Sequence, residues 1–431
     1  MVQKFDAIVV GAGVSGLAAA YVMAKNGLDV IVLERGQKPG SKNVMGGVLY
    51  RKMMEDIIPE FWNEAPLERP IVEQNFWMLG ENSVMKTGYR GNEWAESPHN
   101  NFTVFRSKFD RWFAEKCTQV GALIISETTV TECIVENDRV VGIRTDRPDG
   151  DIYADVVVLA DGVNSLLAKQ LGFHKEWRSD QVAVAVMEVL KMSAEKIEDR
   201  FCLDKGMGST IEIFGDGTKG MVGTAFIYTN KEHISIGCGA LLSDVCKAET
   251  RPYELLAYVK NHPMIRPLLA GSEACEYYAH LIPEGGYKSI PRLTGDGVVV
   301  VGDAAQFVNG IHREGSNMGM TSGRLAAETI IRAKKLGSFD KQTLSYYEGQ
   351  IKSSFIAKDL KKYKNATNTL EKNPAYFNHY IPSVNAAMSE MFTVDGVSKA
   401  EKQKKIIKQF INDRTIFGAA ADVIKLVLAV K

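Results

Sequence analysis

Three glycines near the N-terminus have the spacing of a phosphate-binding turn. Gly11, Gly13 and Gly16 form a GxGxxG pattern. In such a turn the first glycine permits a tight bend, the second lets the backbone approach a pyrophosphate, and the third lets a helix pack on a strand. Glu34 stands further along, where an acidic side chain can accept hydrogen bonds from a ribose. These residue types predict that the chain binds a dinucleotide.

This chemistry requires a strand, a helix and a second strand around the glycines. Residues 7–10 are an apolar run typical of a buried parallel strand. A helix is predicted over 17–26, with Gly27 as its C-cap, and a second strand over 29–33. The N-terminus of such a helix offers amide donors and the positive end of its dipole to phosphate. A lone GxGxxG can be an ordinary glycine-rich turn, but the strand, helix and acid in this order favour the dinucleotide site.

Charged side chains also stand at the ends of later predicted elements. Arg106 opens a helix after an apolar strand, Asp161 follows a second strand, and Asp303 follows a third. In an open parallel sheet, ligands bind at the carboxyl ends of strands. Asp303 could hold a ribitol hydroxyl, and the helix predicted from Asn317 would aim its positive end at a flavin carbonyl. Singly, Asp303 could be an N-cap and Asp161 part of a surface turn; their order after the dinucleotide motif favours a flavin site.

The composition is that of a neutral protein with more than one structural unit. The chain has 431 residues, with 52 basic and 52 acidic side chains, which is long enough for two or three units. Zero net charge argues against nucleic acid as the main partner. The six cysteines form no CxxC pair, so neither a zinc site nor an iron–sulfur cluster is predicted within the chain, and no metal ligand is assigned.

The nucleotide-binding unit is predicted to be discontinuous. Residues 166–289 contain alternating strand-like segments typical of an antiparallel sheet, with a helix expected over 255–269. The nucleotide domain is therefore predicted to comprise 1–165 and 290–337. The remaining residues, 338–431, are predicted to form a helical C-terminal region rich in lysine.

Two later stretches carry a more specific resemblance. Residues 282–291 read IPEGGYKSIP, and residues 298–323 read VVVVGDAAQFVNGIHREGSNMGMTSG. Together with the motifs above, they resemble the electron-transfer flavoprotein:quinone oxidoreductases, and within them the FixC-type flavoprotein subunits, over essentially the whole chain. The resemblance implies an α/β, glutathione-reductase-like FAD-binding fold with an inserted antiparallel sheet domain and a helical C-terminal region.

The resemblance also implies which residues surround FAD. It places there Gly11, Gly13, Gly16, Glu34, Arg106, Asp161 and Asp303. The predicted site further includes Ala12, Ser15, Arg35, Gly46, Gly47, Val130, Gly162, Gly302, Gly315, Asn317 and Met318. No catalytic acid, base or nucleophile is predicted, because electron transfer between flavins requires proximity and a tuned potential. His312 could handle protons on flavin reduction, but packing of its loop or pairing with Glu314 is the simpler interpretation.

The implied activity is the passage of electrons from an electron-transfer flavoprotein towards quinone. A second strand–GxGxxG–helix pattern is missing from the sequence, so a protein donor is expected instead of a nicotinamide nucleotide. Single-chain relatives carry a C-terminal iron–sulfur module whose cysteines this chain lacks, which implies a separate ferredoxin-like subunit. The quinone-contacting glycine pair of those relatives is matched here only by Gly223, and Gly285 and Gly286 complete the predicted quinone contacts.

Three other functions fit parts of the sequence. Geranylgeranyl-reductase-like enzymes, which saturate prenyl chains, share the FAD motifs but usually carry a Tyr-x-Trp-x-Phe-Pro signature. Here residues 222–228 read VGTAFIY, without Trp or Pro. A flavin monooxygenase is disfavoured by the IPEGG segment and the glycine-rich stretch after it. A non-enzymatic FAD-bearing scaffold would dock partners without rapid flavin reduction.

The C-terminal end has two interpretations. A basic run precedes the apolar residues 415–430 and contains Lys399, Lys402, Lys404, Lys405 and Lys408. The apolar segment is too short to cross a bilayer, but it could lie in the interface beside anionic lipid. The commoner arrangement is a terminal helix docked on its own domain or on a ferredoxin-like partner. Because the first strand starts too early for a signal peptide, we expect a cytoplasmic protein, peripheral at the inner face of the cell membrane.

Overall fold

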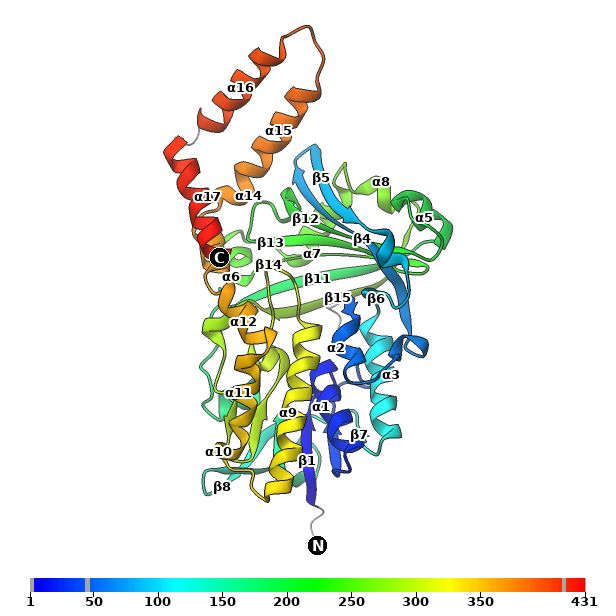
Figure 1. Cartoon of the computed structure of the whole chain (residues 1–431), viewed down its shortest axis with the longest axis vertical. Coiled ribbons are helices and arrows are strands. Elements are labelled where there is room, and N and C mark those ends of the chain that lie inside the picture. The colour runs from blue at the N-terminus through cyan, green and yellow to red at the C-terminus, as the bar shows by residue number, and fades with distance from the viewer. Residues whose placement is uncertain (1–3, 43–46, 413–415, 431) are drawn as a thin grey trace. The chain divides into compact units, whose positions relative to one another are not determined.

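The computed structural model describes residues 4–42, 47–412 and 416–430, and the chain divides into two compact units (Figure 1). Unit 1 combines three segments: Met1–Glu68, Asn100–Val182 and His280–Lys361. Unit 2 combines Arg69–His99, Ala183–Ala279 and Lys362–Lys431. Residues of the predicted helical C-terminal region belong to both units, on either side of Lys361.

Unit 1 is built on an eight-stranded sheet with a parallel centre. The strand order is β16 (Thr294–Gly295), β17 (Val298–Val300), β10 (Asp151–Leu159), β1 (Lys4–Val10), β2 (Val30–Leu33), β7 (Leu123–Ile125), with β9 (Arg139–Thr145) on β10 and β8 (Val130–Glu136) on β9. The strands from β17 to β7 are parallel, and the remaining pairs are antiparallel. The strands β2 and β17 are wholly buried, and burial on both faces explains why every residue in them is apolar.

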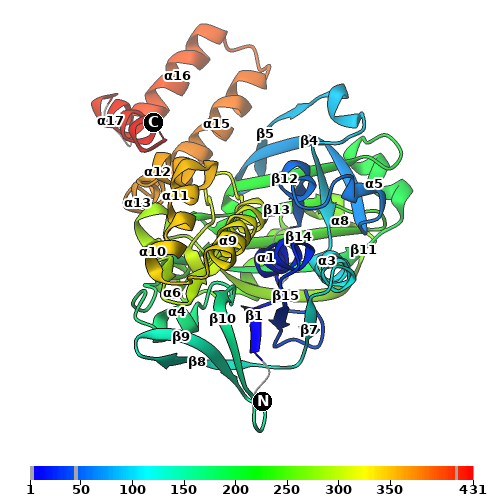
Figure 2. The same cartoon turned by 60° about the horizontal axis from the view of Figure 1, so that its bottom comes forward.

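Helices and short elements complete unit 1. The helices are α1 (Val14–Lys25), α2 (Arg51–Glu55), α3 (Arg106–Gln119), α4 (Leu166–Gln170), α9 (Ser316–Leu336), α10 (Lys341–Leu344), α11 (Tyr346–Ser353) and α12 (Phe355–Lys362). Single 3₁₀ turns are η1 (Phe61–Asn63), η4 (Gly286–Ser289) and η5 (Gly302–Ala305), and β3 (Val48–Tyr50) pairs antiparallel with β6 (Asn101–Val104). The long helix α9 lies beside α1 in both views (Figures 1 and 2).

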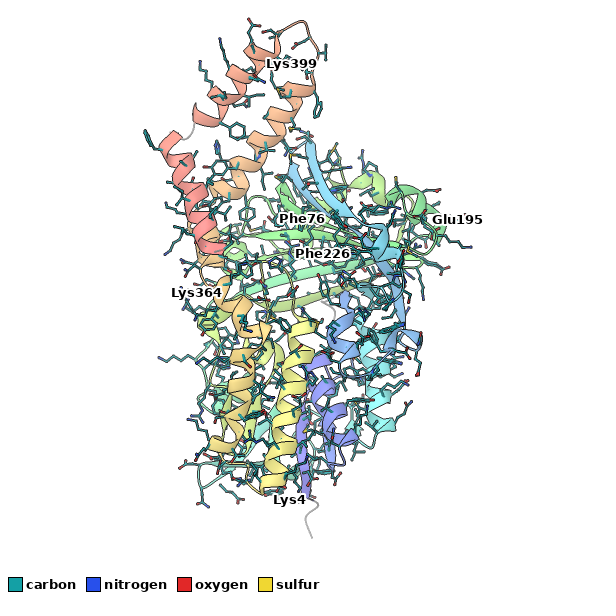
Figure 3. The ribbon with its side chains drawn as sticks, in the orientation of Figure 1. Lys4, Phe76, Glu195, Phe226, Lys364 and Lys399 are labelled. Carbon is teal, nitrogen blue, oxygen red and sulfur yellow. The ribbon has the colours of Figure 1, made fainter. Side chains whose placement is uncertain are left out.

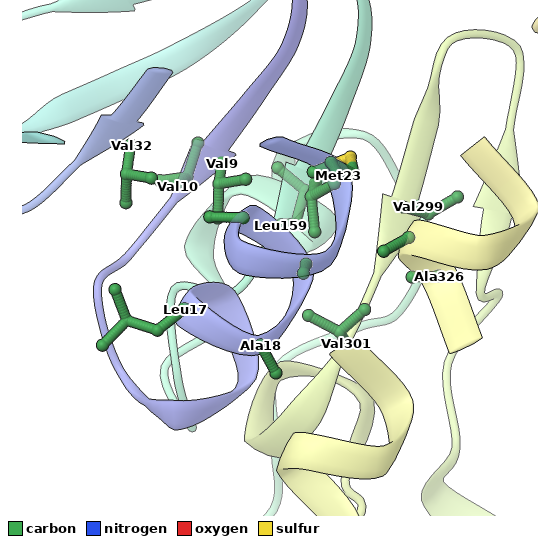
Figure 4. Close-up of a cluster of buried hydrophobic side chains, with 14 of the residues drawn as sticks. Val9, Val10, Leu17, Ala18, Met23, Val32, Leu159, Val299, Val301 and Ala326 are labelled. Atoms are coloured by element: carbon green, nitrogen blue, oxygen red, sulfur yellow. The ribbon is translucent and has the colours of Figure 1, made fainter. Parts of the chain in front are cut away.

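The core of unit 1 lies where α1 and α9 meet the parallel strands. Figure 4 shows apolar side chains from four strand segments and both helices, including Val9, Val32, Leu159, Val299, Leu17, Ala18 and Ala326. Branched residues on the strands suit a pleated buried surface. Alanines on the helices are small enough to let the two helix axes approach each other. The apolar core therefore holds α1 and α9 side by side over the sheet.

The contact between α1 and α9 is closest at Ser15. A Cβ atom added at Gly323 of α9 would come within 2.1 Å of the Ser15 carbonyl oxygen and 3.1 Å of the Ala18 Cβ. A Cβ at Gly319 would come within 2.6 Å of the Ser15 Oγ, and one at Gly302 within 2.2 Å of the same atom. At Gly323 the added atom would meet backbone of α1, so this position requires glycine, whereas at Gly319 and Gly302 it would meet the Ser15 side chain.

We predict that Gly323→Ala destabilises the protein. The added methyl would meet backbone of α1, and overpacking of this kind costs about 1–3 kcal/mol of unfolding free energy. Gly349→Ala on α11 is the matched control, because a Cβ added there would have no neighbouring atom within 4 Å, and replacing glycine in an open helix position gains about 0.5–1 kcal/mol. Chemical denaturation should show opposite signs for the two variants, and equal stabilities would contradict the close approach.

Unit 2 contains the inserted sheet. Its strand order is β15 (Glu273–Pro283), β11 (Val182–Lys191), β14 (His233–Leu241), β13 (Gly223–Thr229), β12 (Gly208–Gly215), β4 (Leu67–Gly80), with β5 (Ser83–Arg90) on β4. The pairs β11–β14, β14–β13, β13–β12 and β4–β5 are antiparallel, whereas β12 and β4 are parallel. Phe76 of β4 and Phe226 of β13 are labelled on this sheet in Figure 3. The fold class is as predicted, with one parallel pair inside the antiparallel sheet.

The helices of unit 2 follow its strands and fill its C-terminal part. They are α5 (Ala194–Phe201), α6 (Leu242–Lys247), α7 (Pro252–Asn261), α8 (Arg266–Leu269), α13 (Ala366–Lys372), α14 (Ala375–Asn378), α15 (Tyr380–Phe392), α16 (Lys399–Asn412) and α17 (Ile416–Val430), with 3₁₀ turns η2 (Asn92–Ala95) and η3 (Asp216–Thr218). The single helix predicted over 255–269 is wrong, because it is broken between α7 and α8. His262 precedes Pro263 and is extended there, at φ −57° and ψ 132°, as proline disfavours helical backbone in the residue before it.

Among the described residues, no helix is both long enough and apolar enough to cross a bilayer.

Candidate cofactor site

The glycine-rich turn between β1 and α1 has the geometry that its sequence predicts. Gly11 has φ +104°, and a Cβ there would lie 2.3 Å from the Ala160 carbonyl oxygen. Such a backbone, pressed against the end of β10, requires glycine. A Cβ at Gly16 would lie 2.0 Å from the Gly11 oxygen. Gly13 is the extended residue directly before α1, so the helix N-terminus opens at the carboxyl end of β1.

Glu34 is tied to this turn by its carboxylate. The side chain is buried, and its Oε2 accepts a hydrogen bond from the Ala12 amide at 3.0 Å while Oε1 accepts one from the Gly36 amide at 2.7 Å. A carboxylate has about four acceptor positions, so two bonds leave capacity for ribose hydroxyls. Glu34 thus fixes the turn after β1 to the end of β2 and stays able to accept further hydrogen bonds.

A buried ion pair stands beside this turn at the start of α3. The guanidinium of Arg106 donates to both carboxylate oxygens of Asp110, at 2.7 and 2.8 Å, and one amine lies 3.4 Å from the Ser316 Oγ at the start of α9. Burial raises the pKa of Asp110 although Arg106 opposes the shift, and Glu34 raises it further. Sequence reasoning missed Asp110; its i, i+4 spacing from Arg106 was the available signal.

The two predicted aspartates both occupy desolvated positions. Burial raises the pKa of Asp161 to about 6 and that of Asp303 to about 6, with Arg106 acting against the shift at Asp303. Oδ2 of Asp161 accepts a hydrogen bond from the Leu167 amide at 3.3 Å, whereas its Oδ1 is buried and lacks a hydrogen-bond partner among the described residues. The Asp161 side chain is half-buried. It does not lie in an exposed surface turn, which was the alternative interpretation.

The first turn of α9 presents buried polar and apolar side chains. Gly315 directly precedes the helix, Asn317 is 3% exposed and Met318 is fully buried. The Oδ1 atom of Asn317 has no hydrogen-bond partner within the described chain, while its side chain bonds Glu314. His312 lowers the pKa of Glu314 by its charge, whereas burial, which is the larger effect, raises that pKa.

The structure also describes the surroundings of most of the other residues predicted to contact FAD. Gly302 has φ +64° and donates its amide to the Ser322 Oγ at 3.0 Å, while Arg35 is exposed and Val130 is half-buried at the start of β8. Gly47 accepts a hydrogen bond from the Val104 amide, and Gly162 has φ +77° with open space around it. Gly46 lies outside the described residues.

The glycines predicted to contact quinone fall in different units. Gly285 and Gly286 belong to unit 1, at the start of η4, and Gly223 opens β13 in unit 2. A Cβ at Gly223 would lie 2.1 Å from the Gly239 oxygen on the neighbouring strand, so strand pairing by itself requires a small residue there. Their contact with quinone stays a prediction.

Comparison with known proteins identifies the family of this chain. Residues 366–431 match a family model described as the ETF-QO/FixC family C-terminal domain, and residues 4–205 match one described as FAD binding domain. Protein FixC of Bradyrhizobium diazoefficiens is 49% identical over 423 residues, covering 97% of each chain. The chain belongs to the ETF-QO/FixC family. Protein FixC of Azotobacter vinelandii is 45% identical over the full length of both chains, and the Escherichia coli probable electron transfer flavoprotein-quinone oxidoreductase YdiS is 38% identical over 94% of each.

Solved structures share the fold at low sequence identity. A geranylgeranyl bacteriochlorophyll reductase-like protein from Thermoplasma acidophilum has a TM-score of 0.73 at 18% identity, covering 96% of this chain and 98% of its own. The myxobacterial FAD-dependent halogenase CndH has a TM-score of 0.65 at 17% identity, covering 99% and 97%. These likenesses concern the fold alone.

FAD is the cofactor of this FixC-family flavoprotein oxidoreductase, and the residues present fit it. Buried polar atoms without a hydrogen-bond partner among the described residues include Asp161 Oδ1, Asn317 Oδ1 and Gln306 Nε2. Unpartnered buried polar groups are costly unless a ligand satisfies them. They occur in or beside the segments that the sequence assigns to FAD, so those segments offer unused donors and acceptors for a polar cofactor.

We predict that Asp303 makes the FAD-free protein less stable as pH rises. Its pKa of about 6 exceeds the ordinary 3.8, so its contribution is full below pH 4 and is lost as pH approaches 6, by about 2–3 kcal/mol. Asp303→Asn should remove this loss, whereas Asn at the exposed Asp199 should not. Urea unfolding of FAD-free protein between pH 4 and 7 measures it, and identical pH profiles for wild type and Asp303→Asn would contradict the prediction.

Proposed function

We propose that this chain passes electrons from an electron-transfer flavoprotein through FAD towards a membrane quinone. The observation that carries the proposal is the full-length similarity to proteins named FixC and to one named as a probable electron transfer flavoprotein-quinone oxidoreductase. The sequence adds support, because it contains one strand–GxGxxG–helix unit. A second GxGxxG, from Gly215 to Gly220, lies between the strands β12 and β13 and is not followed by an α-helix as a nicotinamide site would require.

In this proposal the chain holds and tunes the cofactor instead of supplying acid–base catalysis. FAD, when bound, supplies the ring that accepts and releases electrons. The N-terminus of α1 would bind its pyrophosphate, and Glu34 would accept from its ribose. The N-terminus of α9 carries a positive dipole end that favours added negative charge. Arg106, held by Asp110 and close to Ser316, places a full positive charge near that end.

A separate ferredoxin-like subunit completes the proposed route. Iron–sulfur clusters are held by closely spaced cysteine thiolates, and the cysteines here are scattered from Cys117 to Cys275 without a CxxC pair. The cluster is therefore assigned to another chain. Gly285 and Gly286, with Gly223, are the proposed contacts for quinone, as the resemblance implies.

We predict that a reduced electron-transfer flavoprotein reduces the bound FAD rapidly, whereas NADH alone does so slowly. The reason is that the sequence offers a single nucleotide-binding unit. Stopped-flow absorbance at the flavin band follows the reaction, with an electron-transfer flavoprotein stripped of its own flavin as the control. Fast, saturable reduction by NADH without a protein donor would contradict the proposal, and failure of every protein donor would favour a scaffold.

The C-terminal helix α17 buries a charged residue and exposes apolar ones, the opposite of an ordinary docked helix. Its Asp422 is 2% exposed and is bonded by the hydroxyls of Tyr376 and Tyr380, at 2.7 Å to its carbonyl and 2.8 Å to its carboxylate. The apolar residues Phe417, Val423, Ile424, Val427 and Leu428 are instead 53–88% exposed. The helix thus docks on its own unit by a polar side chain and leaves an apolar face uncovered. We propose that this face lies in the membrane interface.

The basic run before α17 contributes less than its composition indicates. Lys399 opens α16 (Figure 3), Lys402 is buried and pairs with Asp395 at 2.8 Å, and Lys405 pairs with Glu390 at 2.8 Å. Cations already paired within the protein attract anionic lipid weakly. The proposed membrane contact therefore depends chiefly on the apolar face of α17.

We predict that Ile424→Ser with Leu428→Ser lowers binding to vesicles of anionic and zwitterionic lipid at least several-fold, because each loss of buried apolar surface weakens interfacial insertion. Leu336→Ser, at a residue 61% exposed on α9, is the control and should bind as wild type does. Flotation with intact FAD content measures the effect. Unchanged flotation together with lost binding of a ferredoxin-like subunit would assign the face to that subunit instead.

A further inference from the structure

The segment after β15 is fixed to two other parts of unit 1. The Glu284 amide donates to the Gln181 carbonyl at 2.8 Å, and the Gly285 amide donates to the Gln306 Oε1 at 3.2 Å. Gln306 is fully buried and left-handed, at φ +61°, directly after the turn that contains Asp303. Glu284 is therefore held at a fixed position next to the Gly302–Ala305 turn.

The carboxylate of Glu284 lies against the loop that precedes α9. A Cβ at Gly310 would come within 2.1 Å of Glu284 Oε2, so the carboxylate contacts this loop where it lacks a side chain. The loop is a tight hairpin in which Asn309 and Glu314 exchange backbone hydrogen bonds at 2.9 and 3.2 Å. The Asn309 side chain also accepts from the backbone amide of His312 at 3.3 Å. A structured loop, not a freely moving one, faces the carboxylate.

Glu284 is half-buried, and its carboxylate has little around it to stabilise its charge. Among the described residues, no hydrogen-bond donor contacts it, and Arg313 is the charged side chain that acts on it. Burial, the larger effect, raises the pKa of Glu284 to about 7, with Arg313 opposing the shift. The other acid of the hairpin, Glu314, interacts with His312, Asn317 and Asp359 instead. Near neutral pH, Glu284 can therefore gain or lose a proton in response to a modest change in local charge.

The hairpin joins the two features proposed to surround the redox-active end of FAD. It begins just after the Asp303 turn and ends at Gly315, directly before α9. A negative charge added there would act on Glu284 through surroundings of low polarity. We propose that Glu284 binds a proton when the site gains electrons and releases it when they leave.

The balance of this step is simple. One O–H bond forms at the Glu284 carboxylate, with a proton taken from solvent, and the electrons that reduce the site come from its reductant, whether a protein donor or the chemical reductant used in the test below. On reoxidation the same O–H bond breaks and the proton leaves with, or after, the electrons. The inference rests on the proposed placement of FAD beside Asp303 and Asn317, but it requires neither the electron-transfer flavoprotein nor quinone.

The direction of the change in the Glu284 pKa sets the pH range in which proton uptake can be measured. With a pKa of about 7 before reduction, Glu284 is protonated in both redox states at lower pH, so it takes up no proton there. Added negative charge raises the pKa, so uptake occurs above about pH 7. Uptake of one extra proton per two electrons makes the reduction potential of FAD fall by about 30 mV more for each pH unit. This is because one pH unit is a tenfold change in proton concentration, and a tenfold change is worth about 30 mV for a two-electron couple.

The test is potentiometric titration of bound FAD with a chemical reductant and mediators, from pH 5.5 to 9. Wild type should show the steeper slope above about pH 7, and Glu284→Gln should lose it while matching wild type below that pH. Glu314→Gln is the control for the neighbouring acid and should keep the steeper slope. Equal slopes for wild type and Glu284→Gln, or loss of the slope in Glu314→Gln alone, would overturn the proposal.

A second measurement avoids dependence on the variant's folding. Redox-difference infrared spectra of wild type at pH 8 should show a protonated carboxyl C=O band appearing on reduction. The contribution of Glu284 to this band should be absent at pH 6, where Glu284 is protonated in both redox states. A wild-type spectrum without a carboxyl band at pH 8 would overturn the proposal even if Glu284→Gln failed to bind FAD. Because a chemical reductant is used, either result is independent of whether the protein donor reduces the chain.

Discussion

The site depends on how closely α1 approaches α9 at Ser15. Gly319 and Gly323 of α9, and Gly302 of the turn after β17, lie against Ser15. A Cβ at Gly323 would meet the Ser15 backbone, and one at Gly319 or Gly302 would meet its hydroxyl. The first turns of both helices therefore lie together, next to the turn that follows β17. A larger residue would separate the two helix N-termini and move Asp303 away from the glycine-rich turn. The geometry of the candidate site is thus a consequence of helix packing.

Bringing two helix N-termini together concentrates positive dipole ends in one place. Of the buried or half-buried acids of the predicted site, Glu34 accepts a hydrogen bond from the Ala12 amide, just before α1, whereas Asp161 accepts one from the Leu167 amide of α4. Arg106 adds a full positive charge that Asp110 neutralises only locally. Such an environment suits an anionic cofactor with a pyrophosphate and a ring that gains electrons. Positive charge lowers the pKa of an acid, so the raised pKa of Glu284 has a different cause, which is burial; Arg313 opposes that shift.

Local patterns predicted the nucleotide-binding half well, because strands buried on both faces and a glycine-rich turn leave strong signals. The predicted helix from Asn317 begins one residue earlier in the structure, at Ser316. Contacts between distant segments were harder to foresee. Nothing in the sequence near Gln306 shows that its side-chain oxygen accepts from the Gly285 amide. The strands β4 and β5 pair within the inserted sheet, although they lie in the stretch 1–165 that was predicted to belong to the nucleotide domain.

The sequence predictions were wrong in detail where a single residue decided the local structure. The helix expected over 255–269 has suitable apolar residues, but Pro263 forces His262 out of helical geometry and splits it. The burial of Asp422 on α17 is a second case, since amphipathic pattern alone places an acid on the exposed side. The FAD contacts, as a set, stay predictions that a direct measurement must test.

The most direct measurement is backbone hydrogen exchange of the FAD-free protein before and after FAD is added. The account predicts that FAD slows exchange together at the turn after β1, at the turn after β17 and in the first turn of α9, represented by Gly13, Asp303 and Asn317. All three should respond at the same FAD concentration, because the packing of α1 on α9 makes them one site. Protection of only one of these segments, or protection confined to unit 2, would contradict it.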